Sequence, residues 1–110
     1  MAKYLIRASY VGEGVVGLLK EGGTSRRKAV EKAAEALGGR VESMYYAFGE
    51  TDAFVVVELP GNVSAAAASL VANATGTVNA SYTVLITPEE LDEAAEQGRR
   101  LTAAYRAPGQ

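Results

Sequence analysis

Residues 40–59 read RVESMYYAFGETDAFVVVEL, and this stretch decides the fold. It contains two β-like runs, residues 40–48 and residues 53–59, joined by the polar connection Gly49–Asp52. A polar connection of four residues between two such runs is typical of a β-hairpin. The second run is almost continuously apolar, so it places large side chains on both faces of a sheet.

A helix and a further strand flank this hairpin on each side. Before it lie a strand at residues 3–11, a short helix or turn at 15–19 and a helix from Thr24 to about Leu37, with N-cap chemistry at Thr24 and Ser25. After it lie an alanine-rich helix at 62–75, with Asn62 or Ser64 as its N-cap, and a strand at 78–86. The order β–α–β–β–α–β predicts a ferredoxin-like α+β fold. Its first and third strands lie in the centre of an antiparallel four-stranded sheet, with both helices on one face.

The C-terminal segment carries a complete helix start signal. Thr87 suits the N-cap position, Pro88 the first helical position, and Glu90 the third, which together form a capping box. Apolar residues then follow at helical spacing as far as Tyr105. We therefore expect a third helix. We also expect residues 1–110 to form a single domain, because the sequence contains no low-complexity linker and no sign of a second domain.

Composition excludes several classes of function. The 110 residues include 11 Lys plus Arg, 13 Asp plus Glu, no His and no Cys, for a formal charge of −2. Without His or Cys there is no disulfide, thiolate or imidazole metal site, or Ser–His triad. The chain lacks the basic excess of a general nucleic-acid binder. We therefore expect no cofactor, no metal and no nucleic-acid partner.

Membrane association and secretion are not indicated either. No stretch of about eighteen apolar residues is present. The N-terminal segment lacks a long apolar region and reaches a charge at Arg7, so we expect a cytoplasmic protein without a membrane partner.

The sheet is expected to need a partner on its second face. A ferredoxin-like domain covers one face with its helices, yet the run at 53–59 is apolar on both faces, and Leu5 adds an apolar group opposite Tyr4 and Ile6. A second copy of the same face is the simplest cover. The alternative is the C-terminal helix folding over that face within the same chain. Twenty alanines suggest close packing of the two central helices.

The chain resembles the GYD-domain family of small bacterial and archaeal proteins, which belong to the dimeric α/β-barrel group of ferredoxin-like folds. The resemblance runs through five segments: YLIRASY (4–10), GVVGLLKEGGTSRRKAVEKAAEALGG (14–39), VESMYYAFGETD (41–52), LPGNVSAAAASLVANATGTV (59–78) and TVLITPEELDEA (83–94). It implies a homodimer or higher homo-oligomer built by sheet pairing, and it implies no established reaction. The eponymous Gly-x-Tyr-Asp motif falls on residues 49–52, where Thr51 stands in place of the tyrosine.

Arg7 marks a first candidate site, for a small-molecule ligand. A guanidinium in a central strand needs a carboxylate or a wet cavity, and Asp52 and Glu58 are the candidate carboxylates. Tyr45 and Tyr82 could add polar tips to the same cavity, which would then suit a small ligand. The alternative is an Arg–carboxylate pair with a purely structural role, at the sheet edge or at a subunit interface.

A second candidate site, for an anion, lies at the predicted start of the helix at 24–37. Cations are disfavoured there by the helix dipole, yet Arg26, Arg27 and Lys28 occupy the first turn. Together with the backbone of Gly23, Thr24 and Ser25 they could hold a phosphate or carboxylate. The alternative is a solvated cluster or a contact with a neighbouring subunit. Glu50 and Asp52 we interpret as turn residues.

These observations favour a non-catalytic oligomeric domain that binds a small molecule or anion, or that serves in assembly or regulation. The alternative is a cofactor-free small enzyme, monooxygenase- or isomerase-like, that uses an Arg/Tyr-lined cavity. That alternative rests on analogy between folds.

Overall fold

The computed structural model describes all residues, 1–110, and its elements follow the predicted order. Four strands form one antiparallel sheet in the order β2-β3-β1-β4, so β1 and β3 are central. The fold is α+β and ferredoxin-like, as the sequence predicted. The elements are β1 (Ala2–Tyr10), α1 (Glu13–Ala36), β2 (Arg40–Tyr46), β3 (Ala53–Leu59), α2 (Asn62–Ala74), β4 (Val78–Leu85) and α3 (Pro88–Leu101).

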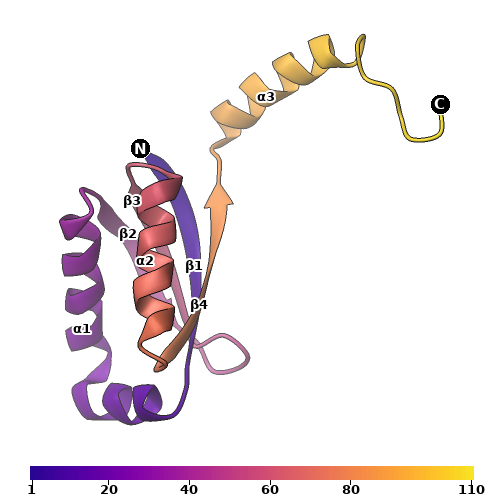
Figure 1. Ribbon diagram of the computed structural model, residues 1–110. Helices are drawn as coiled ribbons and strands as arrows, with labels where there is room; N and C mark the ends of the chain where they lie inside the picture. The colour runs from indigo at the N-terminus through magenta and orange to yellow at the C-terminus, as the bar shows by residue number, and fades with distance from the viewer.

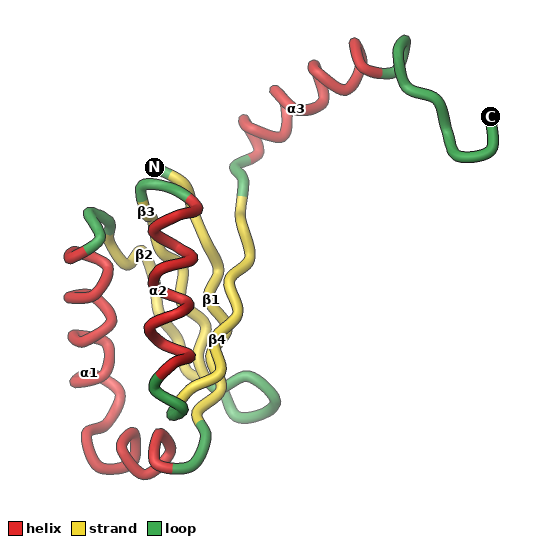
Figure 2. Tube along the Cα trace, in the orientation of Figure 1, coloured by secondary structure: helices red, strands yellow, loops and turns green.

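Helices α1 and α2 lie on one face of the sheet (Figures 1 and 2). Alternate residues of β3 are buried under them, namely Val55, Val57 and Leu59. Tyr4 of β1 is 1% exposed and joins this cluster, with its hydroxyl donating a hydrogen bond to Asn62 Oδ1 at 2.6 Å. The period of two in β1 and β3 therefore separates a helix-covered face from an open face.

Helix α1 differs from its predicted form. A break at Gly22 (φ 78°, ψ 177°) divides it, and the two parts correspond to the predicted short helix and the longer one. The expectation that Thr24 or Ser25 caps the second part is wrong. Gly22 alone leaves helical geometry, whereas an N-cap residue must itself be non-helical. The change of direction is made by a glycine because its φ lies in the left-handed region.

For the other two helices, the predicted N-cap of α2 is wrong and that of α3 is confirmed. Neither Asn62 nor Ser64 caps α2, because Gly61 holds that position and the Asn62 side chain is engaged by Tyr4. In α3 the capping box is complete: Thr87 Oγ1 accepts from the Glu90 N–H at 3.0 Å, and Glu90 Oε1 accepts from the Thr87 N–H at 2.9 Å.

Helix α3 extends away from the rest of the chain instead of covering the sheet (Figure 1). It buries no residue and ends at Leu101, four residues before the predicted end at Tyr105, where no packing supports a further turn. The idea that α3 covers the open face within the same chain is therefore wrong. None of the three helices has both the length and the hydrophobicity that a membrane span requires.

The chain is less compact than usual because α3 extends away from the rest of it. Its radius of gyration is 17.6 Å, against about 13 Å for a compact domain of this length. Only nine of the 110 residues are buried. The chain by itself therefore leaves much of its apolar surface in water.

Candidate functional site

The open face of the sheet is organised in rows that cross the strands. Nearest the hairpin loop, Tyr45, Phe54, Arg7 and Ser81 lie side by side on β2, β3, β1 and β4. Tyr45 is 72% exposed and Phe54 38%, which is high for aromatic side chains in a sheet. This row presents aromatic surface beside a cation.

The next two rows are apolar and then ionic. Val56 and Leu5 lie opposite each other at the centre of the face. In the following row Glu58 lies between Lys3 and Arg40, with Nζ–Oε1 and Nε–Oε2 distances of 3.3 and 2.6 Å. Desolvation raises the pKa of Glu58, but its hydrogen bonds and charge contacts with Lys3 and Arg40 outweigh this and hold the pKa below its usual range.

Lys3 also binds Glu42, with an Nζ–Oε2 distance of 2.8 Å, and the hydrogen bond to Glu42 is the largest cause of a raised Lys3 pKa. The open face therefore carries both signs of charge at one end and an apolar strip at its centre.

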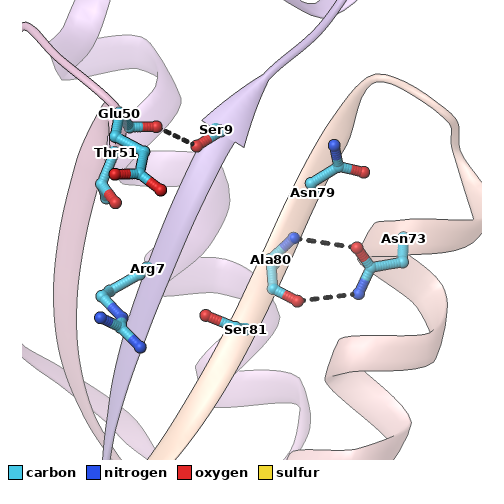
Figure 3. A pocket seen from close by; sticks show the side chains of 8 residues that line it. All are labelled: Arg7, Ser9, Glu50, Thr51, Asn73, Asn79, Ala80 and Ser81. Atoms are coloured by element: carbon cyan, nitrogen blue, oxygen red, sulfur yellow. Dashed lines mark hydrogen bonds between the residues drawn. The ribbon is translucent and has the colours of Figure 1, made fainter.

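Arg7 lines a polar groove of about 400 Å³ that extends from this face past β4 to Asn73 of α2 (Figure 3). The groove lies between β1, β4, α2 and the loop that follows β2, and the Ser9 hydroxyl donates to the Glu50 carbonyl at 2.7 Å across its upper end. Arg7 is exposed and forms none of the ion pairs of the chain. The lining residues are Arg7, Ser9, Glu50, Thr51, Asn73, Asn79, Ala80 and Ser81.

The two carboxylates expected to pair with Arg7 contact other groups. Glu58 lies opposite Lys3, four residues from Arg7 along β1, and is engaged there. Asp52 Oδ2 accepts from the Tyr10 N–H at 2.9 Å, and the Asp52 N–H donates to the Ala8 carbonyl at 2.9 Å. Asp52 therefore fastens the hairpin loop to the end of β1. The expected Arg7–carboxylate pair is absent because the antiparallel register places neither partner beside Arg7.

The two tyrosines of the predicted ligand site lie on opposite faces. Tyr45 is on the open face beside Phe54, whereas Tyr82 lies opposite Ile6 under the helices. Desolvation in that half-buried position raises the pKa of Tyr82. Arg7, Tyr45 and Tyr82 therefore do not line one cavity, and the Arg/Tyr-lined cavity of the enzyme hypothesis is not assembled in this chain.

The residues of the predicted anion site differ in exposure and in direction. Thr24, Ser25 and Arg27 are exposed, whereas Arg26 turns toward the interior and lines a cavity between α1, α2 and the sheet. The Gly23 carbonyl accepts a hydrogen bond from the Tyr46 hydroxyl at 3.0 Å, and desolvation raises the pKa of that phenol. An anion site using all five residues stays a prediction.

The cavity under the helices was missed by the sequence reasoning. It has a volume of about 410 Å³, and twenty residues line it, all aliphatic, Met or Tyr except Arg26 and Thr75. Alanines at helical spacing face it from both helices, at 29, 33 and 36 on α1 and at 67, 68 and 72 on α2. This spacing was the available signal, and reading it as close packing of the two helices was wrong, because α1 and α2 stand apart over the sheet (Figure 1).

No cluster of three or more Asp or Glu side chains is arranged to hold a metal ion. The site-bearing surfaces are thus a mixed open sheet face, the polar groove at Arg7 and the apolar cavity at Arg26.

These features define a small ferredoxin-like α+β domain with an uncovered sheet face. Residues 4–95 match the GYD domain, so the match covers most of the chain. The protein belongs to the GYD-domain family. No curated protein and no solved structure matches the sequence significantly.

Proposed function

We propose that this GYD-domain protein is a non-catalytic homo-oligomeric module whose open sheet face pairs with the same face of a second copy. The supporting observation is the uncovered apolar strip formed by Phe54, Val56 and Leu5 in a chain that buries only nine residues. Apolar area removed from water contributes about 25 cal/mol per Å², and this contribution favours pairing against the entropy lost on association.

A second copy suits this face better than a partner of one charge sign. The ionic row holds the cations Lys3 and Arg40 together with the anions Glu42 and Glu58. A two-fold interface brings the same patch of both subunits together, and a patch with both signs can be complementary to itself. Charge therefore sets the orientation of the pair, and the central apolar strip supplies the attraction.

Helix α3 provides a second contact in this proposal. Its apolar or small residues recur every three or four positions, as in a coiled-coil seam: Leu91, Ala94, Gly98, Leu101 and, beyond the helix end, Tyr105. The first half of α3 is acidic, at 89, 90, 92 and 93, and the last turn is basic, at Arg99 and Arg100. An antiparallel pair of α3 helices would place opposite charges alongside each other.

The test is the molar mass in solution by size-exclusion chromatography with light scattering. We expect the wild type to elute at twice the 11.5 kDa chain mass or more. Val56→Lys, at the centre of the open face, is expected to shift the mass toward one chain. Val63→Lys, at a position 85% exposed on α2, is the matched control and should leave the mass unchanged.

A monomeric wild type at micromolar concentration would contradict the proposal. Equal effects of Val56→Lys and Val63→Lys would contradict the assignment of the interface to the sheet face.

A further inference from the structure

The cavity between the helices and the sheet is walled by small and apolar side chains. Its floor is the covered face of the sheet, with Ile6 and Val55 among the floor residues, and its sides are the alanine rows of α1 and α2. Its volume of about 410 Å³ lies within the range of roughly 300–1,000 Å³ that is typical of small-ligand pockets. It therefore has the size and lining for an apolar ligand body.

Arg26 is the one charged residue of this lining. Its Nε is buried without a hydrogen-bond partner, and Arg26 takes part in none of the ion pairs of the chain. A buried donor left unpaired costs about 1–3 kcal/mol, and more where the group is charged. An anion beside Arg26 would remove this cost.

The one charged group, Arg26, lies at one end of the cavity, while Tyr82 adds a phenol opposite Ile6 on the floor. Arg26, Thr75 and Tyr10 line both the cavity and the neighbouring groove next to the first part of α1, which is more polar and includes Glu13 and Glu21. Ala36 and Leu37, ten and eleven residues further along the chain, line the other end. At about 1.5 Å per helical residue this gives a length of about 16 Å. The cavity thus has its charge at one end and an apolar other end.

We propose that this cavity binds a carboxylic acid with an apolar chain, of the class of medium-chain fatty acids. The carboxylate accepts hydrogen bonds from the Arg26 guanidinium, and the chain runs between the alanine rows toward Leu37. A charge-assisted, bidentate pair of this kind is among the stronger hydrogen-bonded contacts. An alcohol of the same shape offers Arg26 only a neutral, single-oxygen acceptor, which binds a guanidinium more weakly, and an amine would add a second positive charge.

The α3 helix of a second copy fits this cavity less well. A helix with its side chains is about 10–12 Å across, so it would have to lie over the opening, where Ala29 and Val71 are exposed, and could insert only a few side chains into about 410 Å³. The proposal is also separate from sheet pairing, because the cavity and the open face lie on opposite sides of the sheet.

Isothermal titration calorimetry with decanoate below its micelle concentration tests the proposal on the full chain. We expect one decanoate per chain for the wild type and for the Val56→Lys variant, and much weaker binding of decanol and decylamine. Arg26→Gln is expected to weaken decanoate binding by tenfold or more, since a hydrogen bond to a charged group is worth about 1.5–3 kcal/mol. Arg27→Gln, the exposed neighbour, is the matched control and should bind like the wild type.

A second pair of variants tests where the alkyl chain of decanoate lies. Ala68→Leu fills the cavity wall and should abolish binding, whereas Ala66→Leu, exposed on the same helix, should not. Absence of decanoate binding by the wild type, or equal losses in Arg26→Gln and Arg27→Gln, would overturn the proposal. If decanoate binds only the Leu101→Glu variant, in which α3 no longer packs on another copy, then α3 of a second copy occupies the cavity in the wild type. That result would also overturn the proposal.

Discussion

Arg7 and Phe54 lie directly opposite each other on β1 and β3, on the face of the sheet that no helix covers. Arg7 has no carboxylate partner, and Phe54 keeps 38% of its surface exposed. Directly opposed side chains in a sheet have Cβ atoms about 4.5–5.5 Å apart. An aromatic ring and a cation at this spacing offer a second subunit both apolar area and an unpaired charge.

This relationship predicts different effects for the two residues. Phe54→Ala is expected to weaken self-association, because it removes the ring from the proposed interface. Arg7→Ala should change the free energy of unfolding of the monomeric Val56→Lys variant by no more than about 0.5 kcal/mol, since an exposed, unpaired side chain contributes little. Sedimentation equilibrium measures the first effect and urea unfolding the second. An Arg7→Ala variant that is strongly destabilised would show that Arg7 has a structural partner within the chain.

The buried Tyr4 phenol gives a prediction about the core. Its ring is 1% exposed, and its hydroxyl donates to Asn62 Oδ1 at 2.6 Å. Tyr4→Phe keeps the ring but removes the donor, so we expect a loss of about 0.5–1.5 kcal/mol in the free energy of unfolding. Urea denaturation measures this loss.

The double variant of Tyr4→Phe with Asn62→Ala serves as the control. Because both single changes break the same hydrogen bond, their effects should not add. Full additivity would mean that the two side chains stabilise the fold independently.

The elements and their order were predictable from local sequence patterns. The face of the sheet on which some side chains lie was not. The strand at 53–59 has the predicted bounds, and the capping box of Thr87 and Glu90 is complete. In β2, however, the register shifts between Val41 and Ser43, and this irregularity exchanges the faces of the residues that follow. Tyr45 therefore lies on the open face although it is four residues from Val41, which lies under the helices.

The cavity at Arg26 could not be predicted because it depends on the distance between two helices. Alanine spacing on α1 and α2 is compatible with close contact or with a gap, and only the positions of both helices on the sheet decide between them. The inward position of Arg26 follows likewise from the change of direction at Gly22, four residues before it.

Glu58 gives a prediction for the pH dependence of stability. Its pKa is lowered in the folded chain, so its contribution is present above the unfolded pKa and is lost as the pH falls through the folded pKa. We therefore expect Glu58→Gln to destabilise the protein at neutral pH and to differ little from the wild type in acid below the folded pKa. Urea unfolding of the monomeric Val56→Lys variant across pH 2–7 measures this, with Glu35→Gln as the control, because Glu35 is exposed and forms no ion pair. A difference that is constant with pH would point to packing and not to charge.

Gly22 gives a prediction for the break in α1. Its φ of 78° lies in the left-handed region, so Gly22→Ala should cost about 1–2 kcal/mol of stability. Gly17 lies in the first part of the same helix, where a methyl group would meet no atom within 4 Å. Gly17→Ala should therefore stabilise the protein by up to about 1 kcal/mol. Thermal unfolding distinguishes the two signs, and stabilisation by both changes would mean that α1 is straight in solution.

Thr87 gives a prediction that separates local from global stability. Thr87→Ala removes the capping-box acceptor at the start of α3, which typically costs a helix about 1 kcal/mol. Because α3 buries no residue, the urea midpoint of the monomeric Val56→Lys variant should not change, while amide exchange at residues 90–94 should become about fivefold faster. Thr24→Ala, at an exposed helical position of α1, should leave that exchange unchanged. In the oligomeric wild-type background, Thr87→Ala should also weaken association if two α3 helices pair, because pairing requires both to be folded. An unchanged oligomer with a frayed α3 would confine self-association to the sheet face.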